Sequence, residues 1–379
     1  MATFHVIGET LMKPDEILNK SISGDLINLT KNIKTLSKAL QPSIAVGAAI
    51  GAEPTEDGIP TGVFEEIGIG KPLGIEIACV YAGKYKSFLG GRKDAVVVSG
   101  VRSTLTFQGT SRAVNIRSKN VDKNSYLNFT AFEDGTPIVY YSPAMDAESM
   151  VVSFEIMFDN FDTELLDTIS GLLDSAVGIP VFMPAAAYLM GGSKLLKIGS
   201  NLGDAIFSGE PDLKGTIPIQ FSSPLLSPTE PREYVIYNET DRDEFDNLKV
   251  GVIKDGGIQK IRLIDKDSEE EYKGEAPYII VYLNGRLRPD LASFAPTLAT
   301  ASLLKKFYGS DDKTGEYTEI LQDAMQLYND SKYRLKADKI KTDMQRFDKE
   351  SPEYKKFKSL YEAYAANIQT DNFKLPKLA

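Results

Sequence analysis

Between residues 74 and 158 the chain alternates short runs of β-branched and aromatic residues with clusters of turn-forming residues. The runs recur roughly every ten residues, which is typical of an antiparallel sandwich or barrel. Glycine pairs, Asp-Gly and Ser-Pro sequences separate them. We therefore expect seven strands here: Gly74–Tyr81, Ala95–Val101, Ser103–Gln108, Ala113–Arg117, Tyr126–Phe132, Pro137–Tyr141 and Met150–Phe158.

Strand-like segments also occur at the N-terminus and again after residue 215. A tight turn, Lys254-Asp255-Gly256-Gly257, separates two of them and predicts a hairpin. Their return after a helix-like region indicates either an insertion within one β-domain or a second small sheet. The expected strands are Thr3–Ile7, Thr216–Ser222, Glu233–Tyr237, Leu248–Lys254, Ile258–Asp265 and Tyr278–Leu283.

The stretch Ser175–Ser193 is 19 residues long and carries no charge. An apolar run of about 18 residues is long enough to cross a bilayer, but Pro180 and Pro184 suit helix starts better than one continuous span. Amphipathic patterns on both sides predict a helical hairpin over about 163–208. This hairpin either packs on the sheet, contacts a membrane, or binds a partner. The residues expected to make such a contact are Val181, Phe182, Met183, Tyr188, Leu189 and Met190.

The region 289–379 is highly charged and has a helical pattern. Ser351-Pro352 is typical of a helix start and predicts where the last helix begins. Aromatic residues and leucine line one side of that helix, with lysines beside them. One interpretation is a helix packed on the body with a solvated basic face. The other is a docking helix for a partner or an anionic surface.

Together these patterns predict an α+β fold, in which an antiparallel β-sandwich carries an inserted apolar helical hairpin and a helical C-terminal region. We expect three parts. Residues 1–72 form a strand, a helix and a long loop; residues 73–288 form the sandwich with its insertion; and residues 289–379 form the charged helical region.

Several enzyme classes lack the residues that they need. His5 is the single histidine and Cys79 the single cysteine. A Ser-His-Asp hydrolase would need His5 itself as its base, and one histidine with one cysteine cannot make a zinc site of the usual type. The sequence Gly-Ile-Gly-Lys at 68–71 is followed by proline and does not complete a phosphate-binding loop. His5 and Cys79 both lie in apolar runs, so we expect structural roles for them.

Acidic clusters supply the remaining candidate chemistry. The sequence NETDRDEFDN contains Asp241, Asp243 and Asp246, whose oxygens suit Ca²⁺, although the glycine of an EF-hand loop is missing. Residues 265–271 form a second acidic run. Each run is either a solvated loop or a cation site between loops, and we expect no bound cofactor apart from this weak calcium candidate.

The net charge of −10 disfavours a general nucleic-acid binder. The first residues lack the basic and apolar regions of a secretory signal, so we expect a cytoplasmic protein.

Three functional hypotheses follow from these patterns. The first is a non-enzymatic interaction protein that works through protein–protein contacts or a membrane-contacting hairpin. The second is a self-assembling structural subunit of a larger complex. The third is a carboxylate- or metal-dependent enzyme that uses the acidic loops.

Overall fold

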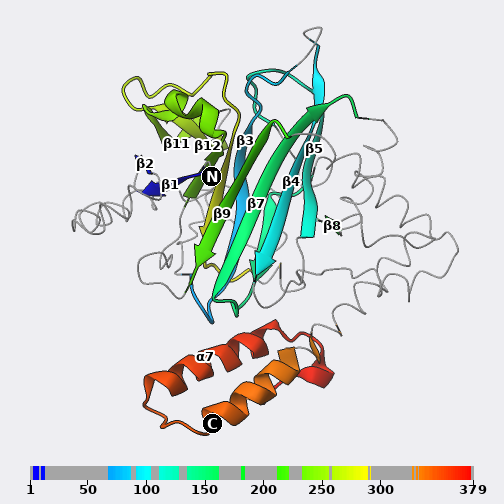
Figure 1. Ribbon diagram of the computed structural model, residues 1–379, viewed down its shortest axis with the longest axis vertical. Coiled ribbons are helices and arrows are strands. Elements are labelled where there is room, and N and C mark those ends of the chain that lie inside the picture. Colours follow the sequence, from blue (N-terminus) through cyan, green and yellow to red (C-terminus); the bar gives the residue numbers. More distant parts are fainter. Residues whose placement is uncertain are drawn as a thin grey trace, which may run out of the picture.

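The computed structural model describes residues 3–7, 10–12, 67–86, 91–103, 111–127, 135–161, 181–183, 211–221, 233–255, 258–288, 291, 327, 330–331 and 333–376. Within these residues the protein consists of antiparallel β-sheets and a helical C-terminal region (Figure 1). The structure confirms both of these parts of the predicted fold.

The larger sheet has six strands in the order β2-β1-β10-β13-β3-β6. Every neighbouring pair is antiparallel. At its centre, β13 is buried along almost its whole length and consists mainly of isoleucine, valine and tyrosine, which favour strands. The strands are β1 (Thr3–Ile7), β2 (Thr10–Met12), β3 (Leu73–Tyr81), β6 (Ile138–Ser142), β10 (Glu233–Tyr237) and β13 (Tyr278–Asn284).

The second sheet has five strands in the order β8-β5-β4-β7-β9, again all antiparallel. Its outermost strand β9 follows a two-residue period, with Leu213 and Ile217 buried and Lys214 exposed. Pro218 is tolerated in β9 because this is an edge strand. The strands are β4 (Lys93–Ser103), β5 (Ser111–Val121), β7 (Ser149–Asp159), β8 (Val181–Met183) and β9 (Leu213–Gln220).

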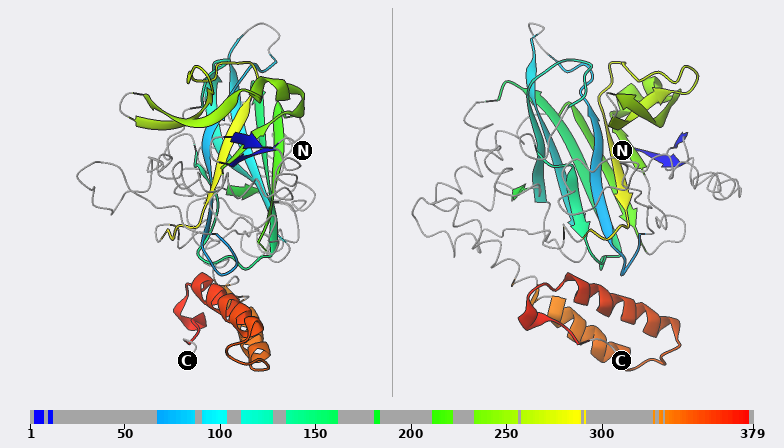
Figure 2. Two further views of the ribbon diagram at one scale, coloured as in Figure 1. Left: turned by 90° about the vertical axis from the view of Figure 1, so that its left-hand side faces the viewer. Right: turned by 180° about the vertical axis from the view of Figure 1, so that it is seen from behind.

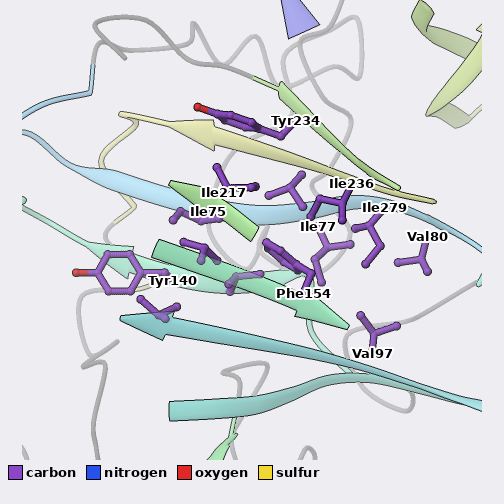
Figure 3. Packing of buried hydrophobic residues seen from close by; sticks show 14 of the residues in the cluster. Ile75, Ile77, Val80, Val97, Tyr140, Phe154, Ile217, Tyr234, Ile236 and Ile279 are labelled. Carbon is purple, nitrogen blue, oxygen red and sulfur yellow. The ribbon is translucent and has the colours of Figure 1, made fainter. Parts of the chain in front are cut away.

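One hydrophobic core contains side chains from both sheets (Figure 3). The six-stranded sheet supplies Ile77 and Ile279, and the five-stranded sheet supplies Val97, Phe154 and Ile217. Each side chain of this size stabilises the fold by about 1.5–3 kcal/mol when it is fully buried.

Hydrogen bonds connect the two sheets at both of their lateral edges. At one edge, the Thr3 hydroxyl donates to the Thr216 carbonyl over 2.9 Å. At the other, the Thr136 N–H donates to the Asn115 carbonyl over 2.8 Å, beside a bridge between Ile116 and Gly135. Gly135 has φ +130°, and an added Cβ would clash with the Asn115 carbonyl oxygen, so this position requires glycine.

Between β10 and β13 the chain forms a 3₁₀ helix, η2 (Glu239–Phe245), and a two-stranded ribbon of β11 (Leu248–Asp255) and β12 (Ile258–Asp265). The register pairs Asp255 with Ile258, which confirms the predicted hairpin. The ribbon packs through a second hydrophobic cluster against the six-stranded sheet.

Within residues 333–376, the C-terminal region forms two helices that lie beyond one end of the sheets (Figures 1 and 2). We call the helical residues 333–344 and α7 (Pro352–Asn367) the helical pair. The Ser351 hydroxyl caps α7 by accepting a hydrogen bond from the Tyr354 N–H, and Pro352 occupies the first turn. This confirms the predicted start of the last helix. The pair has its own small core of Ala337, Tyr361 and Tyr364, followed by η4 (Asp371–Phe373).

Two sequence-based expectations need correction. Within the predicted helical hairpin the structure describes only Val181–Met183, and these residues form strand β8, so the helical prediction is wrong there. Prolines bound this β-prone triplet on both sides, which favours a short strand. The second correction concerns the strand predicted over 126–132, of which the structure describes residues 126 and 127. Neither residue belongs to a strand: Tyr126 forms an isolated bridge to Tyr81, and Leu127 has no regular secondary structure. The remaining residues of both segments lie outside the described part.

Candidate functional site

The three predicted metal ligands lie in or just after η2. Asp243 and Asp246 are three residues apart, so they share a face of a 3₁₀ helix, whereas Asp241 lies on another face. The Asp241 carboxylate accepts hydrogen bonds from the Thr240 hydroxyl and the Asn238 amide. Among the described residues, no group of three or more His, Cys, Asp or Glu side chains is arranged to hold a metal ion.

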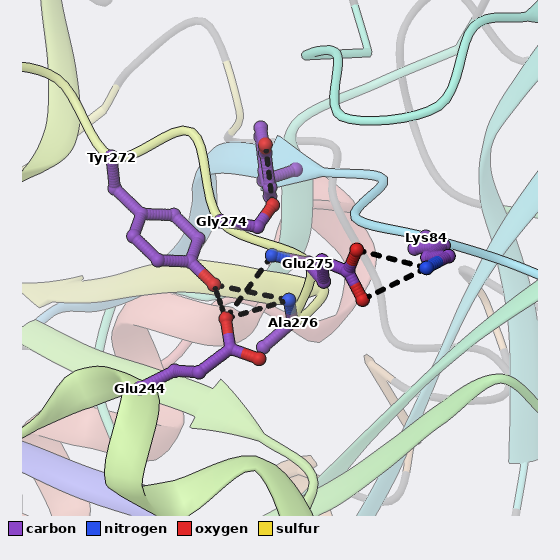
Figure 4. Close-up of polar contacts among 7 residues, drawn as sticks. Lys84, Glu244, Tyr272, Gly274, Glu275 and Ala276 are labelled. Carbon is purple, nitrogen blue, oxygen red and sulfur yellow. Dashed lines mark hydrogen bonds and ion pairs between the residues drawn. The ribbon is translucent and has the colours of Figure 1, made fainter.

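Glu244, in the same helix, turns toward the protein and anchors the loop before β13 (Figure 4). Its Oε2 accepts hydrogen bonds from the Tyr272 hydroxyl and from the backbone N–H groups of Glu275 and Ala276. Burial and the adjacent Glu244 raise the pKa of the Tyr272 hydroxyl above its usual range. An exposed ion pair of 2.8 Å joins Glu275 to Lys84 on the other side of the loop. The acidic sequence therefore has a structural role at this position.

Beneath this loop lies a layer of aromatic rings that contains one buried cation. The Arg262 guanidinium is 3.9 Å from the centroid of the Tyr126 ring. Its Nη1 donates to the Ile261 carbonyl over 2.8 Å and to Cys79 Sγ over 3.4 Å. Burial raises the pKa of the Cys79 thiol to about 11, so it stays protonated at neutral pH. This confirms the buried position expected for Cys79; His5 lies in β1, as expected, and its side chain is outside the described part.

A row of polar side chains crosses three neighbouring strands of the six-stranded sheet. Tyr282 on β13 is directly opposite Glu76 on β3 and Glu233 on β10, so all three share one face. The Tyr282 hydroxyl donates to Glu76 Oε2 over 2.9 Å, and Arg288 Nη1 donates to Oε1 over 3.1 Å. Glu76 is thus a buried carboxylate that accepts hydrogen bonds from both of these side chains.

Glu233 differs from Glu76 because no other described residue forms a hydrogen bond or ion pair with its side chain. Although part of the residue is accessible to solvent, burial of the carboxyl group raises its pKa to about 7. A carboxyl group with this pKa can give up or take up a proton near neutral pH. This row is not predicted by the sequence patterns above, although a glutamate inside the apolar strand LGIEIACVY is a usable signal.

The helical pair attaches to the sheets at the turn between β6 and β7. Lys336 forms a 3.3 Å ion pair with buried Asp146, and its ammonium group lies 5.4 Å from the ring centroids of Tyr333 and Tyr364. Burial raises the pKa of Asp146, and the Lys336 charge opposes this shift. The Asn367 amide donates to the Ala144 carbonyl over 2.8 Å. These contacts position the pair on the body mainly by polar interactions.

The outer surface of the helical pair is apolar in places and basic in others. Leu335 is 67% exposed and Phe347 is 39% exposed, although the Phe347 ring stacks on Phe357. Residues 333–376 contain ten lysine and arginine residues against seven aspartate and glutamate residues, a net charge of +3. The rest of the chain has 33 basic against 46 acidic residues, a net charge of −13.

Three lysines of this surface have no ion-pair partner in the part of the chain that the structure describes. They are Lys339 and Lys341 on the first helix and Lys349 in the turn before α7. Leu335 and Lys339 are four residues apart and therefore lie on one helix face. The helical pair thus presents exposed apolar side chains beside unpaired positive charges.

The contact residues predicted in the uncharged stretch have two outcomes. Val181, Phe182 and Met183 form the edge strand β8, which pairs with β5. Tyr188, Leu189 and Met190 lie outside the described residues. No helix in the described part of the chain is long and apolar enough to span a bilayer.

Comparisons of the chain with protein-family models, with curated proteins and with solved structures found no match.

Proposed function

We propose that this protein acts by binding other proteins, with a β-sandwich body that holds the helical pair as its contact element. The supporting observation is that the helical pair carries the exposed side chains of Leu335 and Phe347 together with the unpaired lysines 339, 341 and 349. Interfaces commonly combine exposed apolar anchors with a charged rim that orients the partner. The proposal includes the cytoplasmic location that the sequence leads us to expect.

The architecture of the helical pair supports a contact role. Its helices pack on each other through Ala337, Tyr361 and Tyr364, so their relative position does not depend on a partner. The outward-facing residues of the two helices therefore do not contribute to this core. A rigid helix face binds with less ordering cost than a disordered segment does.

The proposal is tested with a photo-crosslinking amino acid at position 335 in the cells that make the protein. A matched variant places it at position 119, which is exposed on β5. We expect discrete crosslinked products from position 335 and none of the same products from position 119. Equal products from both positions, or none from position 335, would contradict a contact role for the helical pair.

A second candidate function is proton-transfer catalysis at the row of Glu76, Tyr282 and Glu233, and it is favoured by the raised pKa of Glu233. Its test compares the wild type with Glu233→Gln on panels of chromogenic esters and glycosides. Activity that is present in the wild type and lost in Glu233→Gln supports this function. Equal activity in the two proteins, or none in either, counts against it.

A further inference from the structure

The described part of the molecule has two ends of opposite charge. The helical pair lies at one end, and η2 with the β11–β12 ribbon lies toward the other, as all three views show (Figures 1 and 2). We call the segments 239–246 and 265–271 the acidic tip. The two segments adjoin, because the Lys266 N–H donates to the Asn247 carbonyl over 2.9 Å and its ammonium group donates to the Asp246 carbonyl over 3.0 Å.

The acidic tip contains ten aspartate and glutamate residues against two basic residues, a net charge of −8. Some of these acids have internal roles: Glu244 anchors a loop, Asp265 accepts two backbone N–H bonds, and Glu271 pairs with Arg262 over 3.3 Å. Others are exposed and have no side-chain partner within the described residues. They are Glu239, Asp243, Asp246 and Glu270.

From these two ends we infer that the protein associates with itself head to tail, with the helical pair of one copy on the acidic tip of a second copy. The inference rests on the proposed function, because it takes the helical pair as the contact element and names its partner. Lys339 and Lys349 supply unpaired positive charges, and the tip of every copy supplies unpaired negative charges. Complementary potentials of this kind give specificity and faster association.

The contact joins two different surfaces, so it is heterologous. Each bound copy still presents one free acidic tip or one free helical pair, which allows growth into a ring or an open chain. None of the large exposed hydrophobic residues found in the described part lies at the acidic tip. Charge pairs therefore provide most of the specificity, and we expect the association to weaken strongly with salt.

The experiment is sedimentation velocity of the full chain over a concentration series at two salt levels. At about 0.1 M salt the screening length is about 10 Å, and at about 1 M it is about 3 Å. We expect the sedimentation coefficient of the wild type to rise with concentration at the lower salt level and to remain that of a monomer at the higher one. A wild type that stays monomeric under both conditions overturns the inference.

Charge reversal identifies the two surfaces. The double substitution Lys339→Glu with Lys349→Glu should abolish association, and so should Asp243→Lys with Asp246→Lys. All four substitutions in one chain restore complementary ends and should restore association. A matched control for the lysine variant, Lys119→Glu with Arg286→Glu, makes the same change of −4 in net charge at exposed positions on the body and should associate as the wild type does.

The two double variants, each of which changes only one end of the molecule, also test whether the contact is head to tail. We call them the one-sided variants. Mixed together, they should associate, because one retains its acidic tip and the other retains its helical pair. Circular dichroism must show that all variants remain folded. Failure of the four-fold variant to recover, or association of either one-sided variant alone, overturns the head-to-tail contact. If the wild type is monomeric while position 335 crosslinks to a different protein, the self-association is wrong and the proposed binding function stands.

Discussion

Asp146 and Lys336 form a 3.3 Å ion pair between the β6–β7 turn and the first helix of the helical pair. Asp146 is only 4% exposed. Its partner Lys336 is partly buried beside the rings of Tyr333 and Tyr364, and the ammonium group would lose its only described acidic partner if the carboxylate were removed. The position of the helical pair on the body therefore depends on this contact.

We predict that Asp146→Ala lowers the free energy of unfolding by about 1–3 kcal/mol, because it leaves a partly buried ammonium group without its counter-charge. Urea denaturation measures this loss. The control is Lys356→Ala, which removes a 3.4 Å ion pair with Glu148 in which both side chains are 58% exposed. That change should cost less than about 1 kcal/mol. Equal losses in the two variants would show that Asp146 does not hold the pair.

Gly135 joins the two sheets at a position that no other residue fits. Gly135→Ala would place a methyl group against the Asn115 carbonyl at φ +130°, so we expect a loss of about 2–4 kcal/mol in the free energy of unfolding. Gly91→Ala is the matched control, because an added Cβ there has no atom within 4 Å. In thermal or urea unfolding, we expect the free energy of unfolding of Gly91→Ala to be close to that of the wild type. Equal stability of Gly135→Ala and Gly91→Ala would show that the backbone around Asn115 accommodates the added methyl group.

Much of the β-structure could be predicted from local sequence. Thr3–Ile7, Glu233–Tyr237 and Ile258–Asp265 have the predicted bounds, because each is a run of strand-forming residues next to turn formers or charged residues. The short strands β2 and β8 could not be predicted. Three residues show no period, and such strands form because a neighbouring strand offers hydrogen bonds. The predicted division at residues 72 and 288 stays a prediction.

The candidate sites were harder to predict, because their meaning depends on distant partners. Glu76 meets Tyr282 and Arg288, which follow it by 206 and 212 residues. Glu244 turns inward to a loop that sequence analysis could not place beside it. An acidic run alone does not reveal which carboxylates face solvent and which anchor backbone N–H groups.

Glu244→Ala should lower the free energy of unfolding by about 1–3 kcal/mol, since it leaves the Tyr272 hydroxyl and two backbone N–H groups without their acceptor. Glu275→Ala is the control in the same loop, because it removes only an exposed ion pair with Lys84. Urea denaturation compares the two. A larger loss for Glu275→Ala than for Glu244→Ala would contradict the anchoring role.

Glu233 provides a pH-dependent prediction. Its carboxyl pKa is about 7 in the folded protein against 4.5 for an ordinary glutamate, so the folded state binds more protons than the unfolded state between these values. Stability contributed by this group therefore falls as the pH rises from about 4.5 to about 7. Replacement by glutamine removes this loss. We expect Glu233→Gln to exceed the wild type in stability by about 1–3 kcal/mol at about pH 8, and by much less at about pH 5.

Urea denaturation of the wild type and Glu233→Gln at these two pH values measures the effect. Because the wild type and Glu233→Gln share all other titrating groups, the difference between their free energies of unfolding at each pH cancels the contribution of those groups. Glu239→Gln serves as a control, because Glu239 is exposed and has no described side-chain partner; its effect should be small at either pH. If Glu233→Gln changes stability equally at both pH values, the Glu233 carboxyl does not titrate near neutrality, and the proton-transfer candidate loses its support.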